Sequence, residues 1–185
     1  SRLPIRRPVG WERMFTYLRP LPEKLEAEPN NTPEQANRIE VPAVVNGRIG
    51  TSDDVDYFVF SAKAKQALVM EIFARRLDSP LDSNLTLLNS KGQQIQENDD
   101  TVDRSEGLVT HHSDSYLIYT FPADGDYFLK VVDVQGKGGD EYAYRLSIAP
   151  PQPDYVLRLR PDNVRAPQGG TAMFTVLAFR RDGFN

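Results

Sequence analysis

Two short segments of this chain concentrate oxygen-bearing side chains at the ends of expected structural elements. One is Glu26-Ala27-Glu28-Pro29-Asn30-Asn31, and the other is Asp53-Asp54-Val55-Asp56. Hard cations such as Ca²⁺ bind through roughly six to eight oxygen ligands from carboxylates, amide side chains and backbone carbonyls. If folding brings the two segments together, they can supply a calcium site. The alternative is a pair of solvated acidic turns beside a helix N-terminus, which need no metal.

A second acidic region follows in the middle of the chain. Asn98-Asp99-Asp100 precedes Asp103 and Glu106. A polar hairpin loop is the favoured interpretation, because Asn and Asp are common turn residues. A second calcium ion on the rim of the fold is the alternative, with ligands drawn from Asp82, Asn98, Asp99, Asp100 and Asp114.

Other reactive residue types do not form a catalytic pattern. His111 and His112 are adjacent, so on a strand they point to opposite faces and one metal ion rarely binds both. Ser113-Asp114-Ser115 lies beside them, but the chain has neither a GxSxG turn nor an HExxH pair. We therefore expect no catalytic residues and no enzymatic activity in this chain.

Composition narrows the class of protein further. The net charge is -4, which disfavours a nucleic-acid partner because such a partner requires a basic face. No apolar run approaches the roughly 18 residues that span a bilayer. The chain has no cysteine, so disulfides, thiolate chemistry and Cys-based zinc sites are excluded.

Apolar residues alternate with period two over most of the chain from Ala43 onward, which predicts half-buried strands. Leu68, Met70 and Ile72 share one face, with Glu71 opposite them. We expect strands over residues 55–60, 67–74, 85–87, 116–121, 127–132 and 142–148.

Turn residues separate these strands. Chain reversals are expected at Asn46-Gly47, Ser90–Gly92, Ala123–Asp126 and Gly136–Gly139. One short helix is expected at Thr32–Ala36, with Thr32 as its N-cap. The prediction is an all-β fold, a β-sandwich or jelly roll of about eight strands, with an N-terminal extension and a C-terminal two-strand segment.

The two ends of the chain are expected to lie outside this sandwich, which we place at residues 23–149. Residues 1–22 form a linker or the tail of a preceding domain. Residues 150–185 begin with a stiff proline-rich linker and continue into two strands, which cannot form a stable domain alone. They are either the first strands of a second sandwich or a hairpin added to the first.

Tyrosine is common in the expected strands, with eight in the whole chain. Tyr116, Tyr119, Tyr142 and Tyr144 could form an aromatic face for collagen or sugar. The favoured interpretation is that they are ordinary strand and core residues.

The segment from about Leu25 to Ile148 resembles the bacterial pre-peptidase C-terminal domain. The matching pieces keep their order and spacing over much of the chain. They are Glu28–Thr32 with Ala36, Gly50 with Asp53–Phe60, Leu81–Leu88 with Gly92, Asn98–Asp100, Pro122–Leu129 and Tyr142–Leu146. This family is a small noncatalytic β-sandwich of secreted bacterial proteins, often beside a peptidase domain. The C-terminal Arg180–Phe184 resembles the opening strands of an immunoglobulin-like domain, so residues 150–185 are expected to begin such a domain.

The similar collagen-binding domains of bacterial collagenases imply a specific ligand set. Their pattern of Glu-x-Glu-x-Asn-Asp with Asp-x-x-Asp holds Ca²⁺ between the N-terminal segment and the sandwich. By position it falls on Glu26, Glu28, Asn30, Asn31, Asp53 and Asp56. Asn31 stands where the pattern has an aspartate, and the loop before Asp53 is shorter. The resemblance therefore implies one Ca²⁺ ion, with a second ion as a further possibility.

The resulting expectation is a noncatalytic extracellular module of a larger secreted or surface bacterial protein, stabilised by calcium, that spaces or positions the neighbouring domains of its chain. The alternative is a targeting module of a secreted peptidase or other hydrolase, with an extracellular protein such as collagen, or a polysaccharide, as its partner.

Overall fold

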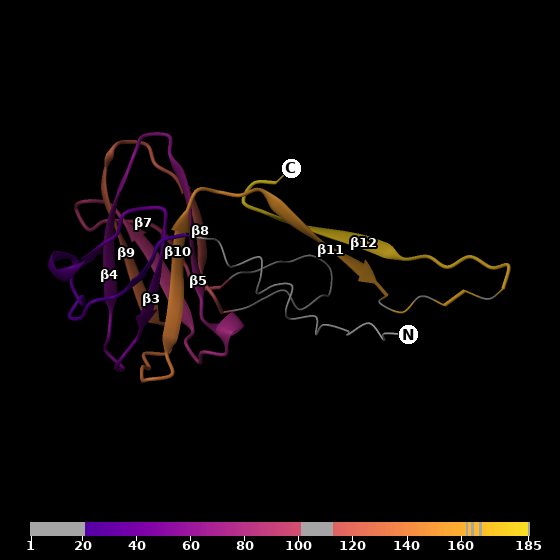
Figure 1. The fold of residues 1–185 in the computed structure, drawn as a ribbon, viewed down its shortest axis with the longest axis horizontal. Coiled ribbons are helices and arrows are strands. Elements are labelled where there is room, and N and C mark those ends of the chain that lie inside the picture. Colours follow the sequence, from indigo (N-terminus) through magenta and orange to yellow (C-terminus); the bar gives the residue numbers. More distant parts are fainter. Residues whose placement is uncertain (1–20, 101–112, 162, 164, 167, 185) are drawn as a thin grey trace, which may run out of the picture.

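The chain folds into two facing β-sheets with a two-stranded ribbon that projects from one side (Figure 1). This computed structural model describes residues 21–100, 113–161, 163, 165–166 and 168–184. Each facing sheet has five strands. The predicted all-β sandwich is therefore confirmed.

The first sheet has the order β1-β3-β10-β5-β8. β1 runs parallel to β3, and the other neighbours are antiparallel. Its strands are β1 (Glu23–Leu25), β3 (Ala43–Arg48), β10 (Ala143–Ala149), β5 (Ala67–Phe73) and β8 (Tyr116–Thr120).

The second sheet has the order β2-β4-β9-β6-β7. β2 runs parallel to β4, so each sheet receives one short parallel strand from the N-terminal part of the chain. Its strands are β2 (Asn37–Arg38), β4 (Asp56–Ala62), β9 (Gly125–Asp133), β6 (Ser83–Leu88) and β7 (Gln94–Asn98).

The core lies between the two sheets, where the apolar faces predicted from alternation meet. Phe58 and Phe60 of β4 are fully buried, as are Leu68, Met70 and Ile72 of β5. One end of the core is aromatic: the ring centroid of Phe121 lies 5.8 Å from that of Phe60 and 4.5 Å from that of Tyr127. Burying a large apolar side chain contributes about 1.5–3 kcal/mol, so this layer holds the sheets together.

One local prediction was wrong. Asn46-Gly47 is not a turn but part of β3, because β3 is paired on both sides through this point. The predicted short helix is confirmed as a single 3₁₀ turn, η1 (Pro33–Gln35), with Thr32 at its N-cap position; the Thr32 side chain makes no cap hydrogen bond to it. A second 3₁₀ turn, η2 (Arg75–Leu77), follows β5.

The C-terminal strands form a sheet of their own. β11 (Asp154–Arg160) pairs antiparallel with β12 (Thr175–Arg181) and joins neither facing sheet. The alternative of a hairpin added to the first sandwich is therefore not what the structure shows. Whether these strands begin an immunoglobulin-like domain stays a prediction.

The N-terminal linker, predicted for residues 1–22, lies almost entirely outside the described residues, as do His111 and His112. In the described part of the chain, no helix is long and apolar enough to cross a membrane.

Candidate metal-binding site

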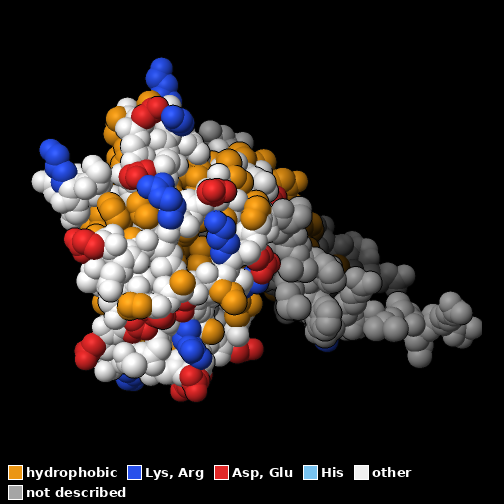
Figure 2. Space-filling model, turned by 60° about the vertical axis from the view of Figure 1, so that its left-hand side comes forward, with side chains coloured by type: hydrophobic (Ala, Val, Ile, Leu, Met, Phe, Trp, Pro, Cys, Tyr) orange, Lys and Arg blue, Asp and Glu red, His pale blue; other side chains and the backbone are white. Residues whose placement is uncertain are grey.

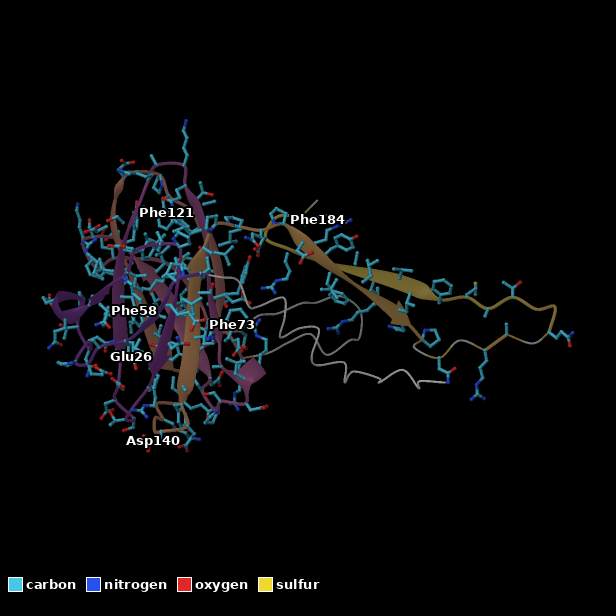
Figure 3. All side chains as sticks on the ribbon, in the orientation of Figure 1. Glu26, Phe58, Phe73, Phe121, Asp140 and Phe184 are labelled. Carbon is cyan, nitrogen blue, oxygen red and sulfur yellow. The ribbon has the colours of Figure 1, made fainter. Side chains whose placement is uncertain are left out.

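Three carboxylates from the two oxygen-rich segments converge at one place in the structure. One oxygen each of Glu26, Glu28 and Asp56 lies within 4.8 Å of the others. Asp56 is fully buried, whereas Glu26 is half-buried and Glu28 is exposed. Figure 3 marks Glu26 on the sandwich.

Backbone pairing on both sheets brings these residues together. The Glu26 N–H donates to the carbonyl of Asn46 at 3.0 Å, which extends the pairing of β1 with β3. On the other sheet the Tyr57 N–H donates to the carbonyl of Asn30 at 2.9 Å, just after β4 begins at Asp56. The segment from Glu26 to Asn30 therefore crosses from one sheet to the other, and its carboxylates meet the start of β4.

Tyr144 of β10 lies beneath the carboxylates. Its side chain is buried, and its hydroxyl lies 2.5 Å from Asp56 Oδ2 and 3.2 Å from Glu26 Oε2. Burial and the two neighbouring carboxylates raise the pKa of Tyr144 well above its ordinary value. The phenol therefore stays protonated and donates to this pair.

Gly47 makes this approach possible. A Cβ atom at Gly47 would lie 2.5 Å from Glu26 Oε2 and 2.5 Å from the Tyr144 hydroxyl. The Arg48 N–H, one residue further along β3, donates to Glu26 Oε1 at 2.6 Å. A glycine in the strand thus leaves the space that the Glu26 carboxylate occupies.

The charges of this cluster oppose one another when no cation is present. Burial, then the charge of Glu26, raises the pKa of Asp56 to about 8. Burial also raises the pKa of Glu26. Carboxylates held together in a partly buried site are stable only if a proton or a cation offsets their repulsion.

Two amide side chains complete the oxygen-rich surroundings. The Asn30 amide is buried against Asp56 Oδ1 and Glu28 Oε2, at 3.1 and 2.9 Å from the amide atom that faces them. If the amide nitrogen of Asn30 faces the two carboxylates, Asn30 donates a hydrogen bond to each of them. If the amide oxygen faces them, it lies among acceptors only, an arrangement that fits a cation shared by all three side chains. The Asn31 amide can likewise present either its nitrogen or its oxygen to Asp54 Oδ1 and the Val55 carbonyl.

The donor set fits a hard cation. Ligand oxygens lie about 2.3–2.6 Å from Ca²⁺, so two ligands of one ion are at most about 5 Å apart. The three carboxylate oxygens satisfy this limit, and the Asn30 amide borders two of them. Glu26, Glu28, Asn30 and Asp56 are the residues that would hold the ion.

Asp53 lies outside this group although it belongs to the predicted ligand set. It is exposed, whereas its neighbour Asp54 is buried. Asp54 Oδ2 accepts the Gly50 N–H at 2.6 Å, and the Asp54 N–H donates to the Thr51 carbonyl at 3.2 Å. These hydrogen bonds hold Asp54 inward in this loop, and Asp53 stays exposed.

The residues of the possible second metal site do not converge as those of the first site do. Asp114 is fully buried, accepts the N–H groups of Ala74 and Arg75, and pairs with Arg76 Nε at 2.5 Å. Asn98 accepts the N–H of Tyr116 and donates to the carbonyl of Asp100. Among the described residues, no second group of at least three carboxylates or histidines meets the same distance limit.

Asp82 and Asp99 take no part in such a group either. Asp82 Oδ2 accepts from Gln135 Nε2 at 3.2 Å, and Asp99 is exposed. Asp103 and Glu106 lie outside the described residues. A second ion at Asp82, Asn98, Asp99, Asp100 and Asp114 stays a prediction without geometric support.

The serines beside Asp114 are structural. Ser83 Oγ and Ser115 Oγ lie 2.8 Å apart, and Ser115 Oγ donates to the Ser83 carbonyl at 2.7 Å. Both serines are fully buried. Their hydroxyls satisfy one another inside the fold.

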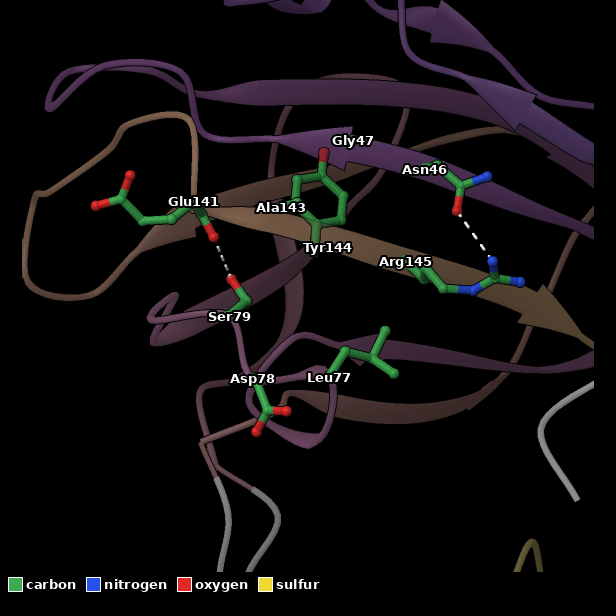
Figure 4. Close-up of a pocket in the computed structure, with 9 residues that line it drawn as sticks. All are labelled: Asn46, Gly47, Leu77, Asp78, Ser79, Glu141, Ala143, Tyr144 and Arg145. Carbon is green, nitrogen blue, oxygen red and sulfur yellow. Dashed lines mark hydrogen bonds between the residues drawn. The ribbon is translucent and has the colours of Figure 1, made fainter. Parts of the chain in front are cut away.

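A shallow hollow of about 270 Å³ lies on the side of the first sheet, next to Tyr144 (Figure 4). Two pairs of its polar groups are hydrogen-bonded: Ser79 Oγ donates to the Glu141 carbonyl at 3.1 Å, and Arg145 donates to Asn46 Oδ1 at 3.2 Å. These groups stabilise the loops around β10 and assemble no nucleophile with a base.

The tyrosines occupy mostly core and strand positions, as the favoured interpretation predicted. Tyr144 is buried, and Tyr119 and Tyr142 pack against the core. On the face that Figure 2 shows, hydrophobic, acidic and basic side chains alternate over short distances.

Comparison with known proteins supports the fold assignment. Residues 54–133 match the family model of the bacterial pre-peptidase C-terminal domain. The predicted resemblance is thereby confirmed for the central part of the sandwich. The match begins after Glu26 to Asp53, so the candidate ligands in that segment rest on geometry.

A curated relative extends this similarity. The chain is 33% identical over 107 residues to a probable subtilase-type serine protease of Deinococcus radiodurans. The aligned part is 56% of this chain but 14% of the protease. This chain therefore corresponds to a small part of the relative that it matches.

Two solved structures align with this chain at low sequence identity. One is the pre-peptidase C-terminal domain of a collagenase from Bacillus anthracis, with 18% identity and a TM-score of 0.44, covering 64% of this chain and 99% of that one. The other is a periplasmic inhibitor of g-type lysozyme from Aeromonas hydrophila, with 16% identity and a TM-score of 0.45, covering 69% of this chain and 97% of that one.

Proposed function

We propose that this chain is a noncatalytic module of a larger secreted or surface protein, in which Ca²⁺ fixes the N-terminal segment to the sandwich. The observation that carries the proposal is the convergence of Glu26 and Glu28 with the buried Asp56. These residues come from a connection between the sheets and from the start of β4, so one ion would tie these two parts of the fold together.

The biological consequence would be rigidity at the N-terminal boundary of the sandwich. β1 is only three residues long and exposed, so backbone pairing alone holds it weakly. A cation bound to Glu26 and Asp56 would hold the end of β1 against β4. The module would then keep a preceding domain at a defined position.

Thermal unfolding with and without calcium tests this proposal. We expect EDTA to lower the melting temperature and excess Ca²⁺ to restore it, because an ion that binds only the folded state stabilises it by mass action. Asp56→Ala should abolish the difference. Asp53→Ala is the matched control, because Asp53 is exposed and outside the carboxylate group. Identical melting curves in EDTA and Ca²⁺ for the unaltered protein would refute calcium binding.

Targeting of a secreted peptidase is the second candidate function. It is favoured by the similarity to a probable subtilase-type serine protease. Co-sedimentation with insoluble collagen and with polysaccharides tests it directly. A spacer is expected to stay in the supernatant, whereas a targeting module should be depleted from it in proportion to the added polymer.

A further inference from the structure

The junction between the sandwich and the C-terminal ribbon contains a set of polar contacts that the calcium proposal does not use. It lies at the β5 and β8 edge of the first sheet, where β11 and β12 leave the sandwich (Figure 1). Figure 3 places Phe184 at this junction, at the base of the ribbon. Its residues come from β5, β8, the linker and the end of β12.

The first contact is an ion pair with a buried carboxylate. Arg181 Nη2, at the end of β12, donates to both oxygens of Glu71, at 2.8 and 2.9 Å. The Glu71 side chain is 9% exposed and that of Arg181 is 34% exposed. Such a pair is shielded from solvent far better than an ordinary surface salt bridge.

Glu71 is held in place from the sandwich side as well. Arg76 Nη1 donates to Glu71 Oε1 at 2.9 Å, and the same guanidinium reaches the Ile72 carbonyl at 2.7 Å. Arg76 also pairs with the buried Asp114 and lies 4.2 Å from the ring centroid of Phe73. The acceptor for Arg181 is therefore preorganised within the sandwich and keeps a partner when Arg181 is removed.

The second contact is made by the residue that follows β12. Tyr116 of β8 donates its hydroxyl to Asp182 Oδ1 at 2.8 Å, and the Gln152 N–H of the linker donates to Asp182 Oδ2 at 2.9 Å. Asp182 thus joins the sandwich, the linker and the ribbon. Its φ of 51° is in the left-handed region, where a residue other than glycine is uncommon.

The Arg181–Glu71 ion pair and the Tyr116–Asp182 hydrogen bond lie next to each other. The Arg181 guanidinium lies 6.0 Å from the ring centroid of Tyr116, so it sits beside the phenol that binds Asp182. Burial, then the hydrogen bond to Asp182, raises the pKa of Tyr116 above its ordinary value, so the phenol remains a donor.

We propose that Glu71, Tyr116, Arg181 and Asp182 form a latch that holds the β11–β12 ribbon in one orientation on the sandwich. The linker Pro150-Pro151-Gln152-Pro153 restricts the path of the chain between them, and the latch fixes the remaining freedom. A segment that continues from this ribbon would be held at a defined angle. This inference adds a second rigid boundary to the proposed spacer role, and it does not require calcium.

Distance measurements between spin labels test the latch. The chain has no cysteine, so Lys91→Cys in a sandwich turn and Thr175→Cys at the far end of the ribbon give one defined label pair. Both positions are exposed. We expect a single narrow distance distribution in the labelled protein.

The latch is removed by Arg181→Ala combined with Asp182→Gly. Glycine tolerates positive φ, so the second change removes the carboxylate without straining the turn. We expect the distance distribution to widen at least about twofold while the melting temperature of the sandwich stays unchanged. Arg180→Ala is the control, because Arg180 is exposed and pairs with Tyr155 within the ribbon.

The outcomes separate this inference from the calcium proposal. A double variant whose distribution is as narrow as that of the unaltered protein would overturn the latch, as would a broad distribution before any substitution. A melting temperature that does not respond to calcium would refute the ion site and leave the latch standing.

Discussion

At the residue scale, the chemistry of the candidate site depends on Asp56. Its carboxylate is fully buried, and its neighbours are the phenol of Tyr144, the carboxylate of Glu26 and the amide of Asn30. The phenol donates a hydrogen bond to Asp56 but carries no positive charge that could offset the carboxylates. Asp56 must therefore hold a proton or share a cation, and these two states compete.

This competition predicts how stability depends on pH when calcium is removed. The pKa of Asp56 is raised to about 8 in the folded protein, and an unfolded aspartate titrates near about 4. Between these values the folded state binds a proton that the unfolded state has released. The free energy of unfolding should therefore fall as pH rises through this window and level off above about pH 8.

Urea unfolding in EDTA across this pH range measures the effect. The Asp56→Asn variant keeps a polar side chain beside Tyr144 but does not titrate, so its profile should be flatter. Saturating Ca²⁺ should flatten the profile of the unaltered protein as well, because the ion binds the deprotonated form. A profile in EDTA that Asp56→Asn leaves unchanged would assign the pH dependence to other groups.

At the element scale, β3 decides whether the N-terminal segment can dock. It pairs with β1 on one side and β10 on the other, and Gly47 leaves room between them for Glu26 and Tyr144. A side chain at this position would separate the carboxylate from the phenol. Gly47 therefore belongs to β3 and also leaves the space that the candidate metal site needs.

Gly47→Ala tests this role. The added Cβ would lie 2.5 Å from atoms of both Glu26 and Tyr144, so we expect a loss of about 1–3 kcal/mol in the free energy of unfolding. The response of the melting temperature to calcium should weaken with it. Gly125→Ala is the matched control, because Gly125 also lies in a strand but its added Cβ would meet no atom within 4 Å. Equal destabilisation by both variants would show that the loss comes from glycine replacement in strands generally.

At the scale of the whole molecule, the sandwich is complete without the ribbon. Its two sheets contain no strand from residues 154–181 within the described chain, and the core lies between those sheets. Glu71 keeps Arg76 as a partner on the sandwich. We therefore expect the sandwich to be stable without the ribbon.

Removal of residues 154–185 should consequently leave a folded sandwich. We expect cooperative thermal unfolding, a melting temperature within a few degrees of the full chain, and an unchanged response to calcium. Calorimetry of the shortened chain measures all three. Loss of cooperative unfolding would mean that the ribbon contributes to the core, contrary to the sheet topology.

The fold class and most of the strands could be predicted from the amino-acid sequence. Period-two alternation in β4, β5 and β10 predicted the side chains that face the core, because one face of each strand must leave water. It did not predict that the opposite face of β5, which includes Glu71, is buried as well. It did not reveal β1, β2 or β7, which are short or polar, nor β3, which contains the expected turn Asn46-Gly47. The turn predicted at Asn46-Gly47 was wrong because glycine is common in turns. In this structure Gly47 lies in a strand, where the absence of a side chain leaves space for Glu26 and Tyr144.

The segments that carry the candidate ligands could also be predicted from the sequence, but which of these residues converge depends on the folded structure. Glu26, Glu28 and Asp56 converge because two sheets bring distant segments together, and the loop before β4 turns Asp54 inward in place of Asp53. Tyr144 entered the site without any signal in its local sequence, since its role depends on residues far away in the chain. Local patterns record burial and turn preference, whereas convergence at a site is a property of long-range pairing.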